Sequence, residues 1–288
     1  MGKITANVSY GLELECVKLS SSGPKTIKDN DYAVQLDHSI RGDSGEILPR
    51  TWPGAGYEII TKPHFVELTM NGDGTKLSLN EKSVIDNVKL LASCSGHVNS
   101  SCGLHVHLGH PKKSKSGLSD GLSHWSPDEI RTMLIIGQIL EPRLLSMVHA
   151  SRHNNTTCQP IAKKYTKTDL GQFYPVGSVS PNKYQNLKRY CWLNLTETVR
   201  KGTRTDSGHG TSPGKGTIEI RFLGETDCPE YISIWVIMWL KIAALVAYAS
   251  PTMAISQVCY SDFLEGDFFA LTTLRMKDEK IRHKKPET

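Results

Sequence analysis

Two short segments of the chain place pairs of chemically active side chains two residues apart. Glu13 and Glu15 alternate with leucines, and His105 and His107 alternate with leucine and valine. Successive side chains of a β-strand point to opposite faces of a sheet, so each pair shares one face and its apolar neighbours share the other. Two carboxylates can bind a hard cation, and two imidazoles can bind a metal ion or a phosphate. Each pair alone is also typical of a half-exposed strand.

Two further segments extend this pattern. Glu219 and Arg221 alternate with isoleucine and phenylalanine, so a potential metal ligand lies beside a guanidinium suited to phosphate. The same pair is typical of a cross-strand salt bridge. Glu58 lies in an otherwise apolar run, where a buried carboxylate needs a partner. Together, the four segments indicate a single polar sheet face that binds divalent metal and phosphates.

The surrounding sequence predicts the elements that would position this face. Alternating apolar residues and turn residues predict strands over 8–17, 32–36, 57–61, 104–108 and 217–223. These strands carry the chemically active residues on their polar faces.

Two helices are marked by their capping residues, and a third is predicted near the end of the sequence. Asn80 is suited to cap a helix over 81–94. Ser126 is followed by a first-turn proline and by a capping-box glutamate three positions on, which predicts a helix to about residue 148, with a kink at Pro142. A last helix is predicted over 261–276.

One more apolar segment, residues 231–250, is long enough to span a bilayer. Lys241 lies near its middle, where a charge opposes membrane insertion by about 2.5 to 3.5 kcal/mol. Pro229, just before the segment, is typical of the first turn of an ordinary helix. We therefore interpret the segment as a buried core helix.

Less regular stretches separate these elements. Residues 151–181 are rich in loop signals, 184–199 fit either a helix or a strand, and 202–216 form a Gly/Ser/Thr-rich segment suited to a mobile lid or linker. A basic tail begins at about residue 277. We expect residues 1–288 to form a single catalytic domain.

The composition is that of an ordinary soluble protein. The 288 residues are 38% apolar with a formal net charge of +5, which excludes a disordered chain and falls short of a dedicated nucleic-acid binder. Seven dispersed cysteines without a C-x-x-C spacing indicate neither a zinc knuckle nor a disulfide framework. The first residues lack the apolar core of a secretory signal, so we expect a cytoplasmic protein without membrane association.

The four motifs occur in a recognisable order. Gly-Leu-Glu-Leu-Glu, Glu-Ile-Ile-Thr-Lys-Pro, Ser-Cys-Gly-Leu-His-Val-His and Thr-Ile-Glu-Ile-Arg-Phe extend over residues 11–223. In this order they resemble the amidoligase family, which is similar to glutamine synthetase and glutamate-cysteine ligase. The resemblance implies an α+β fold, with an antiparallel sheet curved into a half-barrel and helices packed on its outer face.

The resemblance also implies a ligand set. ATP and two or three Mg²⁺ or Mn²⁺ ions would lie against the concave sheet face, with metal ligands at Glu13, Glu15, Glu58, His105 and Glu219. His107 and Arg221 would contact the nucleotide phosphates, and Arg152 and Arg189 would supply further cations for phosphate or substrate. Arg221 and Glu58 are the expected catalytic residues.

The implied activity is ATP-dependent amide formation. The γ-phosphoryl group would pass to a substrate carboxylate, and an amine would then attack the acyl phosphate. The partners are therefore a carboxylate and an amine, of a class that the motifs leave open. Closure of the 202–216 segment would keep water from the activated acid.

Other functions use parts of the same pattern. A zinc hydrolase could bind its metal through His105 and His107 with a third ligand from Glu58 or Glu219. A phosphagen-kinase-like phosphotransferase would use ATP without joining two substrates, and a non-catalytic binding module would keep only the fold. A Walker-type phosphate loop at 209–216 fails at both ends, where glycine and serine or threonine are required.

Overall fold

The computed structural model describes the chain over residues 3–50, 55–71, 76–113, 125–153, 155–156, 158–161, 191–195, 216–224 and 226–282. Arg189 and the predicted segment at 202–216, apart from Gly216, lie outside the described residues, as does the end of the basic tail.

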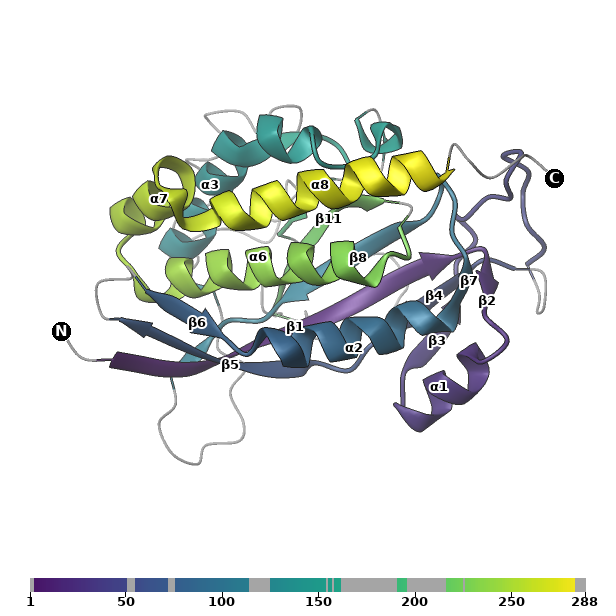
Figure 1. Ribbon diagram of the computed structural model, residues 1–288, viewed down its shortest axis with the longest axis horizontal. Coiled ribbons are helices and arrows are strands. Elements are labelled where there is room, and N and C mark those ends of the chain that lie inside the picture. Colours follow the sequence, from purple (N-terminus) through teal and green to yellow (C-terminus); the bar gives the residue numbers. More distant parts are fainter. Residues whose placement is uncertain are drawn as a thin grey trace, which may run out of the picture.

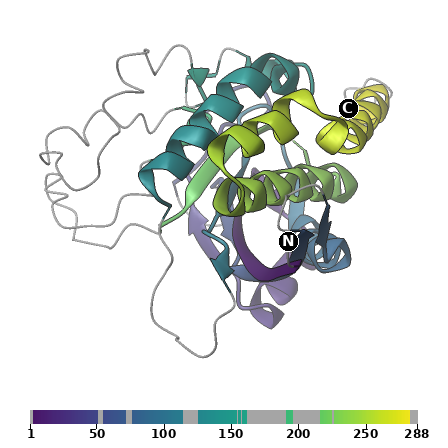
Figure 2. The same ribbon diagram turned by 90° about the vertical axis from the view of Figure 1, so that its left-hand side faces the viewer.

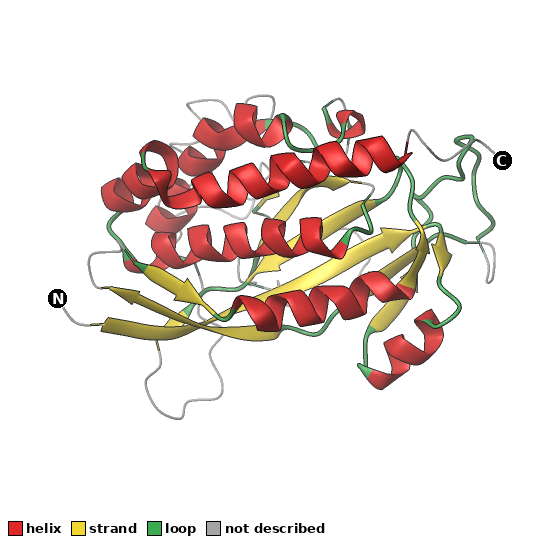
Figure 3. Ribbon diagram, viewed as in Figure 1, coloured by secondary structure: helices red, strands yellow, loops and turns green. Residues whose placement is uncertain are grey.

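The long first strand, β1, organises the main sheet. Its C-terminal half pairs with β4 on one side and β8 on the other, and its N-terminal half pairs with β5. The strand order is β10-β11-β8-β1-β4-β3, and every pair between the described strands is antiparallel. Figure 3 shows the strands in yellow and the helices in red. The strands of this order are β1 (Lys3–Cys16), β3 (Ala33–Leu36), β4 (Tyr57–Ile60), β8 (Gly103–Leu108), β10 (Leu193–Asn194) and β11 (Ile218–Gly224).

Shorter strands extend this arrangement. β5 pairs with β6, β9 pairs with β1, and β2 and β7 form a separate two-stranded sheet. Their bounds are β2 (Lys18–Leu19), β5 (His64–Asn71), β6 (Leu77–Leu79), β7 (Ser95–His97) and β9 (Lys112–Lys113).

The helices begin where the capping residues predict. Asn80 accepts a hydrogen bond from the backbone of Ser83, and Ser126 and Glu129 form a complete capping box. Pro142 lies inside its helix without ending it. The helices are α1 (Gly23–Asp29), α2 (Glu81–Cys94), α3 (Pro127–Leu145), α6 (Pro229–Tyr248), α7 (Pro251–Tyr260) and α8 (Glu265–Arg282), with 3₁₀ turns η1 (Ala150–Arg152) and η4 (Asp262–Leu264).

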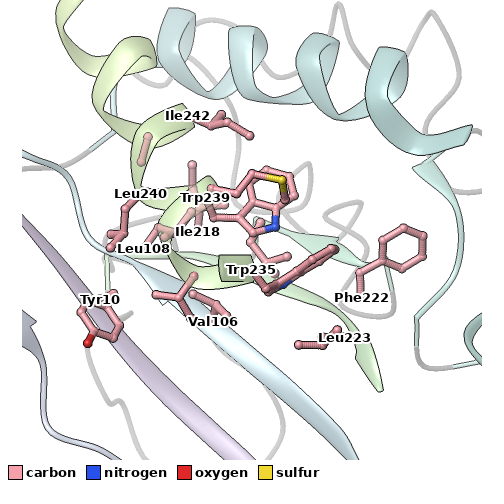
Figure 4. Packing of buried hydrophobic residues seen from close by; sticks show 14 of the residues in the cluster. Tyr10, Val106, Leu108, Ile218, Phe222, Leu223, Trp235, Trp239, Leu240 and Ile242 are labelled. Atoms are coloured by element: carbon pink, nitrogen blue, oxygen red, sulfur yellow. The ribbon is translucent and has the colours of Figure 1, made fainter. Parts of the chain in front are cut away.

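The core lies between the apolar side of the sheet and the helices. α6 packs against β1 and β8 and also against α2 and α8, which run beside it (Figure 1). α3, α6 and α7 contact one another as well (Figure 2). Val106 and Ile218 from the strands meet Trp235 and Trp239 from α6, and all four are fully buried (Figure 4). Burying such side chains contributes roughly 1.5 to 3 kcal/mol each to the free energy of unfolding, which holds this face of the sheet against the helices. Because side chains alternate along a strand, the residues between the buried ones project from the opposite face.

The apolar helix is mainly a core element. α6 passes a length and hydropathy test for a membrane span, but 78% of that window is buried inside the protein. Its one charged residue within the apolar run, Lys241, lies 3.0 Å from a carboxylate oxygen of Asp267 on α8 and 3.5 Å from Glu81 on α2. The charge that opposed membrane insertion thus joins three helices, as expected for a buried core helix.

Two expectations about the elements differ from the structure. The last helix was expected at 261–276, whereas α8 begins at Glu265 after a 3₁₀ turn and continues to Arg282. The separate helix α7 was not predicted, although Ser250 caps it in the usual way, by accepting a hydrogen bond from Met253. The expected mixture of helices and strands and the mainly antiparallel sheet are confirmed. The half-barrel curvature, the helices on an outer face and the single-domain organisation stay predictions.

Candidate functional site

The strand register brings the four sequence motifs together. β1 lies between β4 and β8, and β8 lies between β1 and β11. Directly opposed residues are Glu13 and His105, Glu15 and Glu58, and His107 and Glu219. Because opposed residues share a face of an antiparallel sheet, all six side chains project from the side away from α6.

His105 lies at the centre of the acidic residues. Its Nδ1 atom lies 3.3 Å from Glu13 Oε2, 3.4 Å from Glu219 Oε1 and 3.9 Å from Glu58 Oε1, and its Nε2 atom lies 3.6 Å from Glu15 Oε1. An imidazole surrounded by four carboxylates can be protonated or share a cation with them. Burial lowers the pKa of His105, but the neighbouring carboxylates outweigh burial and the pKa is raised.

The neighbouring side chains fix the orientation of the cluster. His107 lies with Nε2 3.0 Å from Glu13 Oε1 and with Nδ1 3.2 Å from the hydroxyl of Thr217. The Gln35 amide on β3 donates to Glu58, and the Asn194 amide on β10 donates to Glu219. Glu58 and Glu219 therefore each accept a hydrogen bond from an amide at one carboxylate oxygen. Such hydrogen bonds commonly orient metal ligands.

Arg221 enters the site through an irregularity in β11. Ile220 pairs with Val106, and Leu223 pairs with Leu104. Two residues of β11, Arg221 and Phe222, therefore oppose the single residue of β8 that lies between Leu104 and Val106. This is a β-bulge, which re-aims side chains locally. Phe222 and Leu223, adjacent in sequence, can both enter the core, and Arg221 Nη1 still lies 3.3 Å from Glu219 Oε1.

The four carboxylates lie close together and are almost completely buried. Glu13, Glu15, Glu58 and Glu219 are each at most 8% exposed. Burial, followed by the charge of Glu13, raises the pKa of Glu58 to about 7. Burial also raises the pKa of Glu15, although His105 and Arg152 oppose the shift. Like charges held this close favour proton uptake or a bound cation.

Three overlapping groups of side chains could each hold a metal ion. Within each group, one ligand atom per residue lies within 4.8 Å of the others. The groups are Glu13, His107 and Glu219; Glu13, Glu58 and His105; and Glu15, Asp37 and Glu58. All five residues predicted as metal ligands belong to a group, and so does His107, which sequence reasoning assigned to phosphate.

A cavity of about 750 Å³ opens above this face. It is lined by the acidic and histidine residues of the four motifs, by Arg221 and by Arg152 from η1. The lining also includes polar residues that the sequence analysis missed: Gln35, Asp37, Ser39, Ser101, Asn155, Thr156 and Asn194. No clear sequence pattern marks these residues, because most of them lie in loops whose position depends on the tertiary structure.

Comparisons with known proteins give little beyond this geometry. No protein-family model matches the chain, and no curated protein matches it in sequence. Among solved structures, the chain is similar to one described as a novel glutamine synthase homolog, with a TM-score of 0.36 and 11% sequence identity. The match covers 99% of this chain and 68% of that chain. At this level of similarity, the likeness carries no argument about this chain.

Proposed function

We propose that the protein is an ATP-dependent carboxylate-amine ligase that forms an amide through an acyl phosphate. The observation that carries this proposal is the convergence of three carboxylate-rich ligand groups and the Arg221 guanidinium on one cavity. Such a site combines places for divalent cations with a donor for phosphate oxygens, which phosphoryl transfer requires. A volume of about 750 Å³ lies in the range typical of ligand sites.

The composition of the ligand groups favours Mg²⁺ or Mn²⁺. Within the described part of the chain, each group has at most one imidazole, and its other members are carboxylates. Zinc sites in hydrolases are usually richer in nitrogen or sulfur ligands, whereas Mg²⁺ prefers oxygen, and Mn²⁺ also accepts imidazole. His105 and His107 occur in different groups, which disfavours a zinc centre built on both. We propose two or three ions of Mg²⁺ or Mn²⁺.

Each residue has a distinct part in the proposed reaction. Bound metal ions would offset the charge of the triphosphate and polarise its terminal phosphoryl group. Arg221 would donate to the oxygens of that group as its charge is redistributed, and His107 and Arg152 would hold further phosphate or substrate oxygens. Glu58 would help to orient the reacting groups through the same cation sites.

The proposed reaction has two steps. A substrate carboxylate oxygen attacks the γ-phosphorus and ADP leaves, which gives an acyl phosphate. The amine nitrogen then attacks the acyl carbon, loses a proton and displaces inorganic phosphate. The buried site limits the access of water, which would otherwise hydrolyse the activated acid.

Hydroxylamine provides the test. The protein is incubated with ATP, Mg²⁺, hydroxylamine and a panel of amino acids and dicarboxylic acids, and both hydroxamate and ADP are measured. We expect equal amounts of the two products with at least one acid. Arg143→Ala is the control, because Arg143 pairs with Glu265 on the surface between α3 and α8. Two results would contradict the ligase function. One is release of ADP together with a substrate phosphorylated on a guanidine group, and the other is hydrolysis of a substrate that proceeds without ATP.

A further inference from the structure

A pair of glycines interrupts the side chains of the polar sheet face. Gly103, the first residue of β8, is the register partner of Gly224, the last residue of β11. Further along the same two strands, the opposed pair His107 and Glu219 both carry functional side chains. The two glycines therefore leave a gap in this face at the end where β8 begins and β11 ends.

The side chain of Arg152 fills this gap. A Cβ atom built on Gly103 would lie 2.6 Å from Arg152 Nη2, and one built on Gly224 would lie 2.4 Å from its Nε and 3.0 Å from its Cγ. The distances to Nη2 and Nε are shorter than real Cβ contacts, so a side chain at Gly224 would displace Arg152 from its position. We call the gap left by Gly103 and Gly224 the glycine slot.

Arg152 is held in the slot but is not fully satisfied there. It is 3% exposed, and its Nη2 donates to the carbonyl oxygen of Cys102. Its buried Nε has no hydrogen-bond partner among the described residues, and neither has Nε of Arg221. Two guanidiniums that line one cavity, each with a buried and unused Nε donor, favour a bound anion.

Arg152 and Arg221 also act on the same neighbours. Both guanidiniums lower the pKa of Glu15, against the larger effect of burial. Both also lower the pKa of the Cys158 thiol, although burial raises it to about 12. Arg152 also reaches Gly224 on β11, the strand that carries Arg221, and both guanidiniums line the same cavity.

We infer that Gly103 and Gly224 are positioning residues, whose missing side chains seat Arg152 so that it binds one oxyanion together with Arg221. This inference rests on the proposed function for the source of that oxyanion, which is either a phosphoryl group of the nucleotide or a carboxylate of the acid. A planar guanidinium binds either group through paired donors, and its orientation decides whether both donors reach.

Anion binding without turnover tests the inference. Affinities for inorganic phosphate, pyrophosphate and glutarate are measured by calorimetry in the presence of Mg²⁺, for the parent protein and for the variants Gly224→Ala, Gly103→Ala and Arg152→Ala. We expect Gly224→Ala and Arg152→Ala to weaken at least one anion by about tenfold or more. Gly103→Ala should have a smaller effect, because its shortest contact is with the far end of the flexible Arg152 side chain, and its next is with Glu15 Oε2 at 3.3 Å.

Gly11→Ala is the matched control. Gly11 lies on the same face, opposite His107, and a Cβ there would have only an ordinary contact at 3.8 Å. Its anion affinity should equal that of the parent. Thermal unfolding of every variant separates a lost binding group from a lost fold, and Gly103→Ala takes the place of Gly224→Ala if the latter does not fold.

A double variant distinguishes positioning from a general structural effect. If Gly224 acts only through Arg152, adding Gly224→Ala to Arg152→Ala should weaken anion binding no further. Additive losses, or a Gly224→Ala variant that binds every anion as tightly as the parent, would overturn the inference. A loss confined to phosphate and pyrophosphate assigns the oxyanion to the nucleotide, and a loss confined to glutarate assigns it to the acid. A protein that passes these tests yet forms no hydroxamate would refute the ligase function and leave the glycine slot intact.

Discussion

Glu13 and Glu58 differ from the other acidic residues because each belongs to two of the three ligand groups. Glu13→Gln keeps the shape of the side chain but removes a charge next to both His105 and His107. We predict that Glu13→Gln weakens Mn²⁺ binding at two positions by about tenfold or more, whereas Asp37→Asn affects only one. Titration followed by the electron paramagnetic resonance of free Mn²⁺ counts the positions.

Glu67→Gln is the control for this prediction, because Glu67 is an exposed carboxylate on β5 of the same sheet. Equal Mn²⁺ binding by Glu13→Gln and Glu67→Gln would show that the cluster is not a metal site.

Arg221 is expected to act on turnover more than on binding. Its guanidinium is brought to the cavity by the β-bulge and lies beside Glu219. Arg221→Lys keeps the positive charge but loses the planar fork of donors, so we predict that kcat falls by roughly 10²-fold while KM for ATP changes little. Steady-state ADP release measures both constants. An unchanged kcat would reduce Arg221 to a structural partner of Glu219.

Among the elements, α3 has the most completely specified start. Ser126 N donates to Glu129 Oε2 at 2.6 Å, and Glu129 Oε1 lies 3.0 Å from Nε2 of His110. Burial raises the pKa of Glu129, but these hydrogen bonds outweigh burial and hold the pKa below its ordinary value of 4.5. A carboxylate with a lowered folded pKa stabilises the fold above its unfolded pKa, and this contribution is lost as the pH falls through the folded pKa.

We therefore predict that Glu129→Gln lowers the free energy of unfolding by about 1 kcal/mol at pH 6. The difference from the parent should shrink as the pH falls below about 4.5, and urea unfolding at a series of pH values measures it. A difference that stays constant over this range would mean that the charge of Glu129 contributes nothing.

A second prediction at this scale concerns the contact between α6 and α8. Lys241 and Asp267 have side chains that are only 18% and 10% exposed. Lys241→Met would leave the Asp267 carboxylate without its partner, in a position where burial already raises its pKa. We predict a loss of about 3 kcal/mol in the free energy of unfolding, and recovery of most of it when Asp267→Leu is added. Chemical denaturation of the single and double variants decides the point.

Local sequence patterns predicted most of the strands and helices. The features that they missed depend on tertiary contacts. The period-2 motifs identified the strands and the shared face of Glu13 and His105, because both depend only on neighbouring residues and strand geometry. Sequence could not predict the glycine slot, because Arg152 reaches Gly103 and Gly224 from a separate 3₁₀ turn. Asp37 was missed for the same reason, since it follows β3 in a loop.

For the whole molecule, the strands that carry the polar face also belong to an apolar core with the helices. The core joins strands and helices into one apolar cluster, which holds β1, β8 and β11 in register regardless of what lies on the polar face. Four carboxylates can therefore be kept close together at a cost to stability, as long as the core supplies the difference. A cation that binds only the folded arrangement would remove part of that cost.

This leads to a prediction about the stability of the whole chain. A ligand that binds the folded state alone adds RT ln(1 + [L]/Kd) to the free energy of unfolding, which is about 2.7 kcal/mol at a hundredfold excess over Kd. We predict that Mn²⁺ or Mg²⁺ raises the thermal unfolding midpoint, that a chelator reverses the rise, and that Glu13→Gln removes most of it. In the absence of metal, Glu13→Gln should unfold at a higher temperature than the parent, because it removes one of the charges that raise the pKa of Glu58. Scanning calorimetry with and without metal measures all four values. A metal-induced rise of equal size in the parent and in Glu13→Gln would mean that the cation acts elsewhere on the protein, and the metal assignment of the sheet face would then be wrong.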